Sequence, residues 1–256
     1  MLRGFYTAAS GILTQQRTLN VLTNNIANAQ TPGFRGSRVV TTTFEHELLT
    51  RIEGYNTGRI GTGTPMRMVS EVPIRFDPTS LEETERPYDI AIDGEGYFNV
   101  QAAADEEGNE GARYLTRNGS FDLDEQNQLV LPGVGVVLGE KGAIKLNTAY
   151  FTVESDGTIY DESGKVVDKL LVTIPPEGTE INQIQNGLYQ TADMDANQPV
   201  TAQTKLVQGW FERSNIDVNR EYTLVMEAQR AFQACSTALQ IIDNIDQKAA
   251  AQIAAV

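Results

Sequence analysis

The chain has 256 residues, of which 40% are hydrophobic, and its formal net charge is −14. This length allows two domains, or one large domain with appendages, and the hydrophobic content is sufficient for a packed core. The negative charge argues against a nucleic-acid partner, because such partners are bound through basic residues that neutralise phosphates.

The charge is unevenly distributed along the chain. Residues 1–30 contain two bases and no acid, and residues 212–256 contain six acids and four bases. Residues 31–211 therefore carry a net charge of −14. We expect the two ends to be neutral together and the middle to be a soluble, self-repelling surface.

The first expected element is a helix over residues 2–28, about 40 Å long at a rise of about 1.5 Å per residue. Large apolar residues recur in it every seven positions, at Phe5, Ile12, Leu19 and Ile26. Leu2 and Ala9 precede the first two by three positions, which is the pattern of a coiled-coil seam. A seam exposed on a lone helix costs free energy, so we expect this helix to have a partner.

Asparagines cluster near the end of this helix, where a Thr-Pro-Gly sequence favours a turn. They are Asn24, Asn25 and Asn28. Because asparagine is a poor helix former, the cluster has two open interpretations. The helix frays near its C-cap, or the amides form a network that binds neighbouring backbone.

The middle of the chain has the pattern of β-structure. Residues 34–76 alternate short strands with turns, and we expect a short helical turn at residues 44–49 and an exposed loop at Gly54, Gly58, Gly61 and Gly63. The expected strands further on cover residues 88–92, 97–100, 113–116, 120–123, 129–131 and 206–211. Strands at this spacing, separated by Gly, Asn and Asp turns, favour an antiparallel barrel or sandwich.

The last expected element is a helix that begins near Val218 and runs to the C-terminus. Its apolar residues again follow the seam pattern, at Val225, Ala228, Phe232, Cys235, Leu239, Ile242 and Ala249. Glu221 lies in its first turn, where an acid is favoured by the helix dipole. Two ends that pair with each other, or with other copies, indicate an assembly component rather than a free enzyme.

Motifs for cofactor or metal chemistry fail on their spacing. Gly94 and Gly96 could begin a dinucleotide fingerprint, but Asn99 stands where the third glycine belongs and a strand follows. A hairpin turn is the better interpretation. Asp122 and Asp124 resemble a calcium loop that lacks both its glycine and its final glutamate, so we expect a hairpin tip. We predict no cofactor, no metal ion and no catalytic residue.

The single cysteine excludes an internal disulfide. Cys235 lies on the apolar seam, where we expect it to be a buried filler, and His46 lacks the second histidine of a zinc protease. The start of the chain has no continuous apolar region, so we expect no cleaved signal peptide. No apolar run reaches the length of a membrane span.

Four separated motifs resemble the signatures of bacterial flagellar rod and hook proteins, in the right order and across nearly the whole chain. They are residues 8–12 (AASGI) with 24–34 (NNIANAQTPGF), 89–98 (DIAIDGEGYF), 116–121 (TRNGSF), and 211–217 (FERSNID) with 228–232 (AQRAF). Among the motif residues are Thr31, Pro32, Gly33, Phe34, Gly94, Gly96, Phe98, Ser214, Asn215, Gln229 and Arg230. Four motifs together make the resemblance specific.

The resemblance implies a structural, non-enzymatic subunit of the flagellar rod, located in the basal body of the cell envelope. The implied partners are other copies of the chain, neighbouring rod and hook proteins, and the flagellar type III export apparatus, which secretes its substrates unfolded and without cleavage. The segment from Leu49 to Gly61 looks short for a distal rod protein, so proximal rod, distal rod and a rod-like homologue stay open. Cys235 stands where the family often has asparagine.

The expected fold is α+β, with a β-rich central domain between N- and C-terminal helices that form a discontinuous coiled-coil layer. We expect residues 1–31 and 215–256 to pair as assembly helices, residues 32–76 and 198–214 to form an intermediate layer, and residues 77–197 to form the outer domain. The expected assembly interface consists of Phe5, Ile12, Leu19, Asn24, Asn25, Ile26, Asn28, Val225, Phe232, Cys235, Leu239 and Ile242.

The alternative is a secreted enzyme or ligand-binding β-domain that oligomerises through helical ends. The two hypotheses differ in what they require of the β-rich part. A pocket with convergent polar groups and a perturbed titrating residue would favour the alternative.

Overall fold

The computed structural model describes residues 2–44, 47–53, 56–63, 66–74, 79–102, 111–146, 150–184, 187–200 and 204–254. The chain divides into two compact units, each built from separate stretches of sequence. Unit 1 comprises residues 1–27, 36–75 and 216–256, and unit 2 comprises residues 28–35 and 76–215. Both ends of the chain therefore belong to the same unit.

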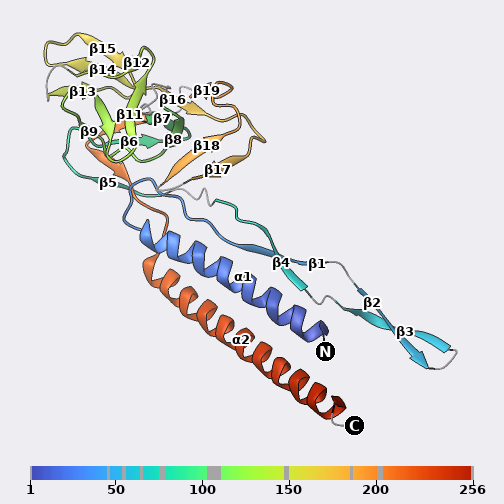
Figure 1. The fold of residues 1–256 in the computed structure, drawn as a ribbon. Coiled ribbons are helices and arrows are strands. Elements are labelled where there is room, and N and C mark those ends of the chain that lie inside the picture. Colours follow the sequence, from blue (N-terminus) through green and yellow to red (C-terminus); the bar gives the residue numbers. More distant parts are fainter. Residues whose placement is uncertain are drawn as a thin grey trace. The chain divides into compact units, whose positions relative to one another are not determined.

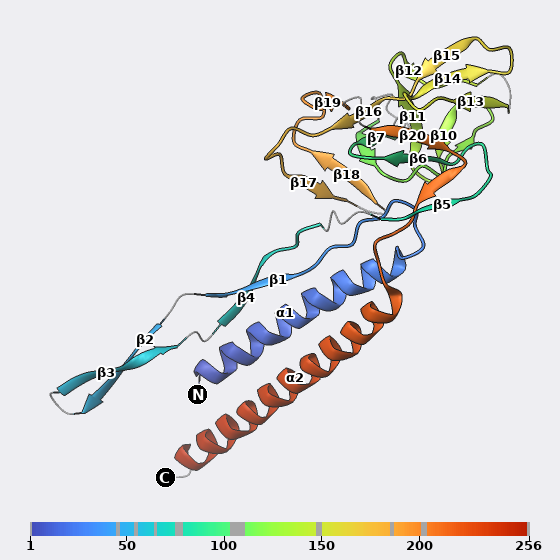
Figure 2. The ribbon, with the colours of Figure 1, turned by 180° about the vertical axis from the view of Figure 1, so that it is seen from behind.

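Unit 1 contains both helices, α1 (Leu2–Ala27) and α2 (Val218–Ala254), close to their expected bounds. They lie side by side with the N- and C-termini at the same end, so they run antiparallel (Figure 1, Figure 2). Asp217 caps the start of α2, because its Oδ1 atom accepts hydrogen bonds from the backbone N–H groups of Asn219 and Arg220, at 3.0 and 3.3 Å.

Two antiparallel strand pairs complete unit 1. β1 (Val40–Phe44) pairs with β4 (Met66–Glu71), and β2 (Glu47–Glu53) pairs with β3 (Asn56–Gly63). The valine and threonines of β1 favour a strand, because β-branched side chains fit a pleated surface. β4 packs against α1, so α1 lies between this ribbon and α2 (Figure 1).

Two expectations for these strands are wrong. Residues 44–49 do not form a helical turn, because Phe44 ends β1 and residues 47–49 begin β2, while residues 45 and 46 lie outside the described residues. Of the glycines expected in an exposed loop, Gly58, Gly61 and Gly63 lie in β3, and Gly54 lies outside the described residues. Backbone pairing with β2 overrides the low strand propensity of glycine.

Unit 2 is built around a ten-stranded sheet in which all pairs are antiparallel. Its order is β17 (Ile181–Gln183), β18 (Leu188–Thr191), β8 (Arg113–Thr116), β7 (Tyr97–Ala102), β11 (Gly135–Gly139), β10 (Leu129–Leu131) and β9 (Asp122–Leu123), with β12 (Gly142–Ala143) on β11, β16 (Val172–Ile174) on β7 and β19 (Gln198–Pro199) on β16. The α+β class is thus confirmed. In the described residues this path does not close on itself, and the barrel- or sandwich-like detail stays a prediction.

Smaller sheets accompany the main one. They are β13 (Phe151–Val153) with β14 (Thr158–Asp161) and β15 (Val166–Lys169), β6 (Ile90–Asp93) with β20 (Lys205–Gln208), and β5 (Leu81–Glu83) with β21 (Trp210–Glu212). The strand expected at residues 206–211 is therefore two strands. Gly209 separates them with a positive φ of 78°, which glycine adopts without strain, and its N–H donates to the Asp89 carbonyl at 2.7 Å.

The core of unit 2 is one cluster of buried apolar side chains that its sheets contribute jointly. Phe98 of β7 and Phe121 are fully buried, and their rings meet edge to face with centroids 5.1 Å apart. The first four residues of β7 are all buried, which shows that this central strand is covered on both faces. The family-motif residue Phe98 is thus a core residue.

Candidate functional site

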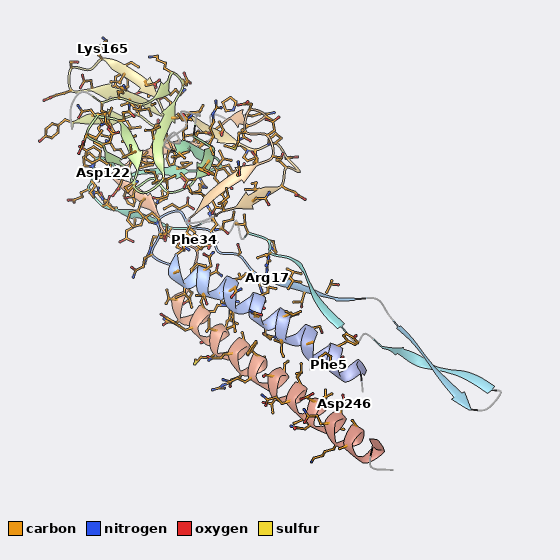
Figure 3. The ribbon with its side chains drawn as sticks, in the orientation of Figure 1. Phe5, Arg17, Phe34, Asp122, Lys165 and Asp246 are labelled. Carbon is orange, nitrogen blue, oxygen red and sulfur yellow. The ribbon has the colours of Figure 1, made fainter. Side chains whose placement is uncertain are left out.

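The buried face of α2 follows the expected seam. The partly or fully buried positions from residue 225 to 249 include Val225, Ala228, Phe232, Cys235, Leu239, Ile242, Asp246 and Ala249, at alternating spacings of three and four. All seven apolar residues predicted for the C-terminal series lie on this face. Asp246, near the C-terminal end of α2 (Figure 3), adds one carboxylate to it.

The buried face of α1 differs from its expected seam. Its most buried residues are Ala8, Thr14, Leu22 and Asn25, at 8%, 4%, 8% and 2% exposure. The predicted apolar series is less covered, since Phe5 near the N-terminus (Figure 3) is 40% exposed and Ile12, Leu19 and Ile26 are half-buried. Three of these four most protected residues of α1 are small or polar, and Leu22 is the one large apolar side chain among them.

Two glycines of α1 allow it to approach α2 closely. A Cβ atom at Gly11 would lie 2.9 Å from Cys235 Sγ, and one at Gly4 would lie 3.2 Å from Ile242 Cδ1. Residue 11 is therefore level with residue 235, and residue 4 with residue 242. This pairing places Cys235 against backbone rather than against a large apolar side chain.

Asn25 joins three segments of unit 1. Its Nδ2 donates to the Ser37 carbonyl at 2.9 Å and to Glu221 Oε2 at 3.3 Å, and its Oδ1 accepts the Ser37 N–H at 3.1 Å. This is the backbone-binding amide that one of the two sequence interpretations describes. Asn24 is exposed, and Asn28, in unit 2, is buried and accepts a hydrogen bond from the Thr31 hydroxyl at 3.3 Å. The three asparagines thus do not act alike.

Unit 1 leaves large apolar side chains exposed on both helices. They are Phe5, Tyr6 and Leu13 on α1, at 40%, 52% and 67% exposure, and Tyr222, Met226, Ile241 and Ile245 on α2, at 51–54%. Phe5 and Tyr6 meet edge to face with ring centroids 6.0 Å apart. Aromatic residues and methionine are enriched at protein interfaces, so these side chains indicate contacts beyond the helix pair.

A groove of about 370 Å³ opens in unit 1 between α1, α2 and the extended residues 37–39. We call it the helix groove. Its apolar lining comes from Val21, Leu22, Val39, Leu224, Ala228 and Ala231. Polar side chains from all three segments complete the lining, with Glu227 as its one acid and Arg38 as its one base.

Unit 2 holds the segment that follows α1 against the segment that precedes α2. The Gly33 N–H donates to the Glu212 carbonyl at 2.7 Å, and the Asn215 N–H donates to the Phe34 carbonyl at 3.4 Å. Gly33 has a φ of +67°, and a Cβ atom there would lie 2.3 Å from the Arg117 carbonyl carbon. Only glycine fits this position, and Phe34 beside it is fully buried.

A buried charge cluster lies at the same place. The Glu212 carboxylate pairs with Arg35, accepts a hydrogen bond from the Thr79 hydroxyl, and lies 3.3 Å from Arg117 Nε. Arg117 Nη2 also donates to the Gly94 carbonyl at 2.7 Å. Burial lowers the pKa of Arg117, and the Glu212 carboxylate opposes that shift. Buried charges need such partners, so the cluster fixes the relative positions of these segments.

Asp89 joins the two central motifs in a second polar network. It is 2% exposed and accepts hydrogen bonds from the hydroxyls of Thr84, at 2.7 Å, and Ser120, at 2.9 Å. The Ile90 N–H donates to the Gly119 carbonyl at 2.9 Å, and a Cβ atom at Gly119 would lie 1.8 Å from the Ile90 oxygen. The motif at residues 116–121 therefore needs glycine at residue 119.

The rejected cofactor motifs have structural roles. Asp124 Oδ1 accepts the N–H groups of Gln126 and Gln128, at 3.0 and 2.6 Å, and so forms the turn between β9 and β10. Gly94 and Gly96 have φ values of 125° and 124°. They do not form a hairpin turn as expected, because β6 pairs with β20 and β7 pairs with β8 and β11.

Comparison with known proteins gives three family matches. They are the C-terminal domain of flagellar basal body rod FlgEFG proteins at residues 207–253, the flagella basal body rod protein at residues 5–35, and the flagellar hook protein FlgE/F/G D1 domain at residues 91–190. The flagellar hook-basal body complex protein FlhO of Bacillus subtilis is 32% identical over 99% of both chains. The chain belongs to the flagellar basal-body rod protein family.

Further similarities agree with this assignment. The flagellar basal-body rod protein FlgG of Bacillus subtilis is 33% identical over 97% of this chain and 98% of its own. The FlgF protein of Caulobacter vibrioides is 29% identical over 95% and 94% of the two chains. The chain is therefore a structural rod-type subunit of the flagellar basal body, and the family resemblance found in the sequence is confirmed.

The structure of this rod protein gathers some of the family-motif residues and separates others. Gly33, Phe34 and Asn215 meet beside the charge cluster, whereas Gln229 and Arg230 lie on exposed positions of α2. The sequence analysis did not select the charged residues Arg35 and Glu212 as site residues. Glu212 lies within the motif at residues 211–217 and Arg35 directly follows the motif at residues 24–34, but no pattern in the sequence marks a charge as buried.

Two findings limit the chemistry of the rod protein. In the described part of the chain, no helix is long and apolar enough to span a membrane. Across the same residues, no group of three or more His, Cys, Asp or Glu side chains is arranged to hold a metal ion. His46 lies outside them.

Proposed function

We propose that this rod protein polymerises through α1 and α2, which form an inner coiled-coil layer of the flagellar rod. The observation that carries the proposal is the exposure of large apolar side chains on helices that already pair with each other. Tyr6, Leu13, Tyr222, Met226, Ile241 and Ile245 are each more than half exposed. Burying a side chain of this size contributes about 1.5–3 kcal/mol, so neighbouring copies would gain stability by covering them.

The remaining residues form the outer layers in this proposal. Residues 1–31 pair with 215–256, residues 32–76 with 198–214 form the intermediate layer, and residues 77–197 face outward. The net charge of −14 in residues 31–211 supports this order, because like charge on the outside discourages lateral association. The partners are copies of this chain and neighbouring rod and hook proteins, and the chain reaches them unfolded through the flagellar type III export apparatus.

The proposed role is structural rather than enzymatic, although unit 2 holds a cavity of about 870 Å³ beside the charge cluster. Arg35, Tyr97, Arg117 and Glu212 line it. Burial raises the pKa of Tyr97, so its phenol stays protonated at neutral pH. Both arginines are paired with Glu212. The two arginines and Glu212 are thus paired with one another, which favours a structural role over the enzymatic alternative.

Deletion of the gene tests the proposal. We expect basal bodies purified from the deletion strain to end within the rod, because a rod subunit is needed before the parts beyond it can be added. Electron microscopy shows where assembly stops, and an epitope-tagged copy of the chain should restore both the structure and swimming. Complete basal bodies with hooks in the deletion strain would contradict a rod role.

A further inference from the structure

We propose that unit 2 holds a binding site for a small zwitterion, a molecule whose carboxylate and cationic group are joined by a short apolar stem. The site is the cavity of about 870 Å³ beside the buried charge cluster. Its described lining residues all belong to unit 2, so the site does not depend on the helices. The inference goes beyond the proposed rod role and leaves that role unchanged.

The first observation is a buried hydroxyl group that has no partner in the described part of the chain. Tyr97 begins β7, lines the cavity and is only 8% exposed, yet its hydroxyl makes no hydrogen bond to a described residue. Its ring is held in place, because the Tyr189 ring centroid lies 5.5 Å away and Arg117 Cζ lies 5.8 Å from the Tyr97 centroid. Buried hydroxyls are normally hydrogen-bonded, so this one indicates a partner that comes from outside the chain.

The buried charges beside Tyr97 are not balanced. Arg35 and Arg117 share the single carboxylate of Glu212, and Arg117 Nη1 is buried without a hydrogen-bond partner among the described residues. We call these three side chains and Tyr97 the floor of the cavity. Burial raises the pKa of Tyr97 while Arg117 and Arg35 oppose the rise, so the hydroxyl is within electrostatic range of both arginines and stays a donor. A carboxylate that accepts from this hydroxyl would supply the missing negative charge.

The exposed part of the lining, which we call the rim, carries the opposite charge. It contains the acids Asp93, Glu95 and Glu177. Asp93 and Glu95 flank Gly94, whose carbonyl accepts the 2.7 Å hydrogen bond from Arg117 Nη2. Because consecutive Cα atoms are only about 3.8 Å apart, these acids begin close to the guanidinium group of the floor. A purely anionic ligand would be repelled by the rim, whereas a cation close to the carboxylate makes the ligand complementary to both parts.

Apolar side chains complete the lining and suit the stem of such a ligand. They are Leu81, Ile92, Ile174, Pro175, Pro176 and Ile181. The volume of about 870 Å³ lies within the range of pockets that enclose small ligands, about 300–1,000 Å³. An apolar lining with a few convergent polar groups is the usual composition of such pockets.

Isothermal titration calorimetry of the full chain with three molecules of one length tests the site. The probe ε-aminocaproate carries both charges, caproate carries only the carboxylate, and hexylamine carries only the cation. We expect ε-aminocaproate to bind in a one-to-one ratio with a Kd in the millimolar range or below. Caproate should bind about tenfold more weakly because it lacks the cation for the rim, and hexylamine should not bind because the donors of the floor need an anion.

Single substitutions assign the two charges of the ligand to the floor and the rim. Tyr97→Phe removes only the hydroxyl, which has no partner in the described part of the chain, so the unfolding temperature should not change while the affinity for ε-aminocaproate falls about tenfold. Glu95→Gln should weaken the binding of ε-aminocaproate but not that of caproate. The matched control is Tyr160→Phe, which removes a half-buried hydroxyl of β14 outside the lining and should bind as the unsubstituted chain does.

Three results would overturn the site. They are the absence of saturable binding of ε-aminocaproate in the millimolar range, equal affinities for ε-aminocaproate and caproate, and an affinity for ε-aminocaproate that Tyr97→Phe leaves unchanged. None of these results bears on the rod role, which deletion of the gene tests separately.

Discussion

Gly11 of α1 faces Cys235 of α2 so closely that a Cβ atom on the glycine would lie 2.9 Å from the cysteine sulfur. Real Cβ atoms do not approach other heavy atoms at this distance, so the helices pair as they do because residue 11 has no side chain. The cysteine occupies the space that a larger residue on α1 would need. The spacing of the two helices can therefore be tested with substitutions that add or remove one heavy atom at residues 11 and 235.

We expect Gly11→Ala to impair swimming, because the added methyl group forces α1 and α2 apart. The intrinsic helix propensity acts in the opposite direction, since alanine favours a helix by about 1 kcal/mol over glycine. Combining Gly11→Ala with Cys235→Ala removes the collision and should restore swimming in soft agar. If Gly11→Ala alone swims normally, or if the double variant is no better, the helices do not assemble at this spacing.

Asn25→Asp should destabilise unit 1 through the contact with Glu221. The substitution removes the amide donor that lies 3.3 Å from Glu221 Oε2 and places a second carboxylate beside the first. Loss of a buried hydrogen bond costs about 1–3 kcal/mol, and the like charge adds to that cost. Thermal unfolding of the full chain, followed through its helical circular dichroism, would measure the effect.

The matched variant Asn25→Asp with Glu221→Gln separates the two causes. A neutral amide at residue 221 can donate to the new carboxylate, so it should recover the part of the lost stability that comes from Glu221, while the hydrogen bond to the Ser37 carbonyl stays lost. Equal unfolding temperatures for the single and double variants would show that Asn25 and Glu221 are not coupled.

Glu212→Gln should destabilise unit 2 strongly, because it leaves the guanidinium groups of Arg35 and Arg117 buried without their carboxylate. Removing one partner of a buried ion pair typically costs about 3–5 kcal/mol. Glu82→Gln is the control, since Glu82 pairs with Arg213 at 3.3 Å with both side chains at least half exposed. An exposed pair contributes about 0–1 kcal/mol. Similar denaturant midpoints for the two variants would contradict the role of the buried cluster.

Unit 2 should fold without the helices. A fragment of residues 28–215 contains the complete apolar core and the buried charge cluster, so we expect a soluble monomer with β-type circular dichroism and a cooperative thermal transition. Analytical ultracentrifugation measures its mass. An unfolded fragment, beside a folded full-length chain at the same concentration, would show that the helices are needed for folding as well as for assembly.

The sequence predicted the elements that depend on local pattern. The seven-residue spacing placed the buried face of α2, and the strands at residues 113–116 and 129–131 match β8 and β10. The helical turn expected around residues 44–49 was wrong, because pairing between strands decides the conformation of that segment. Local propensity carries little information about such pairing.

The candidate site was predictable only in part. The apolar spacing of α1 identified Phe5 and Ile12, but α1 also lies close to α2 at Gly4 and Gly11, which a search for large apolar residues passes over. The cluster of Arg35, Arg117 and Glu212 joins residues up to 177 positions apart. Only the folded chain shows that these charges are buried together.

The central claim is that the rod assembles through the paired terminal helices, and Phe232→Ala tests it most directly because Phe232 lies on the buried face of α2. Phe232 belongs to unit 1, so the substitution should leave unit 2 folded. Truncating a well-packed phenylalanine costs about 3–5 kcal/mol, and in a polymer even part of that cost recurs in every copy.

We predict that Phe232→Ala cells export the protein but do not swim and lack complete rods in electron micrographs. Glu125→Ala, which changes an exposed residue of the turn between β9 and β10, should swim as wild type does. Wild-type swimming and complete rods in Phe232→Ala cells would contradict assembly through the terminal helices.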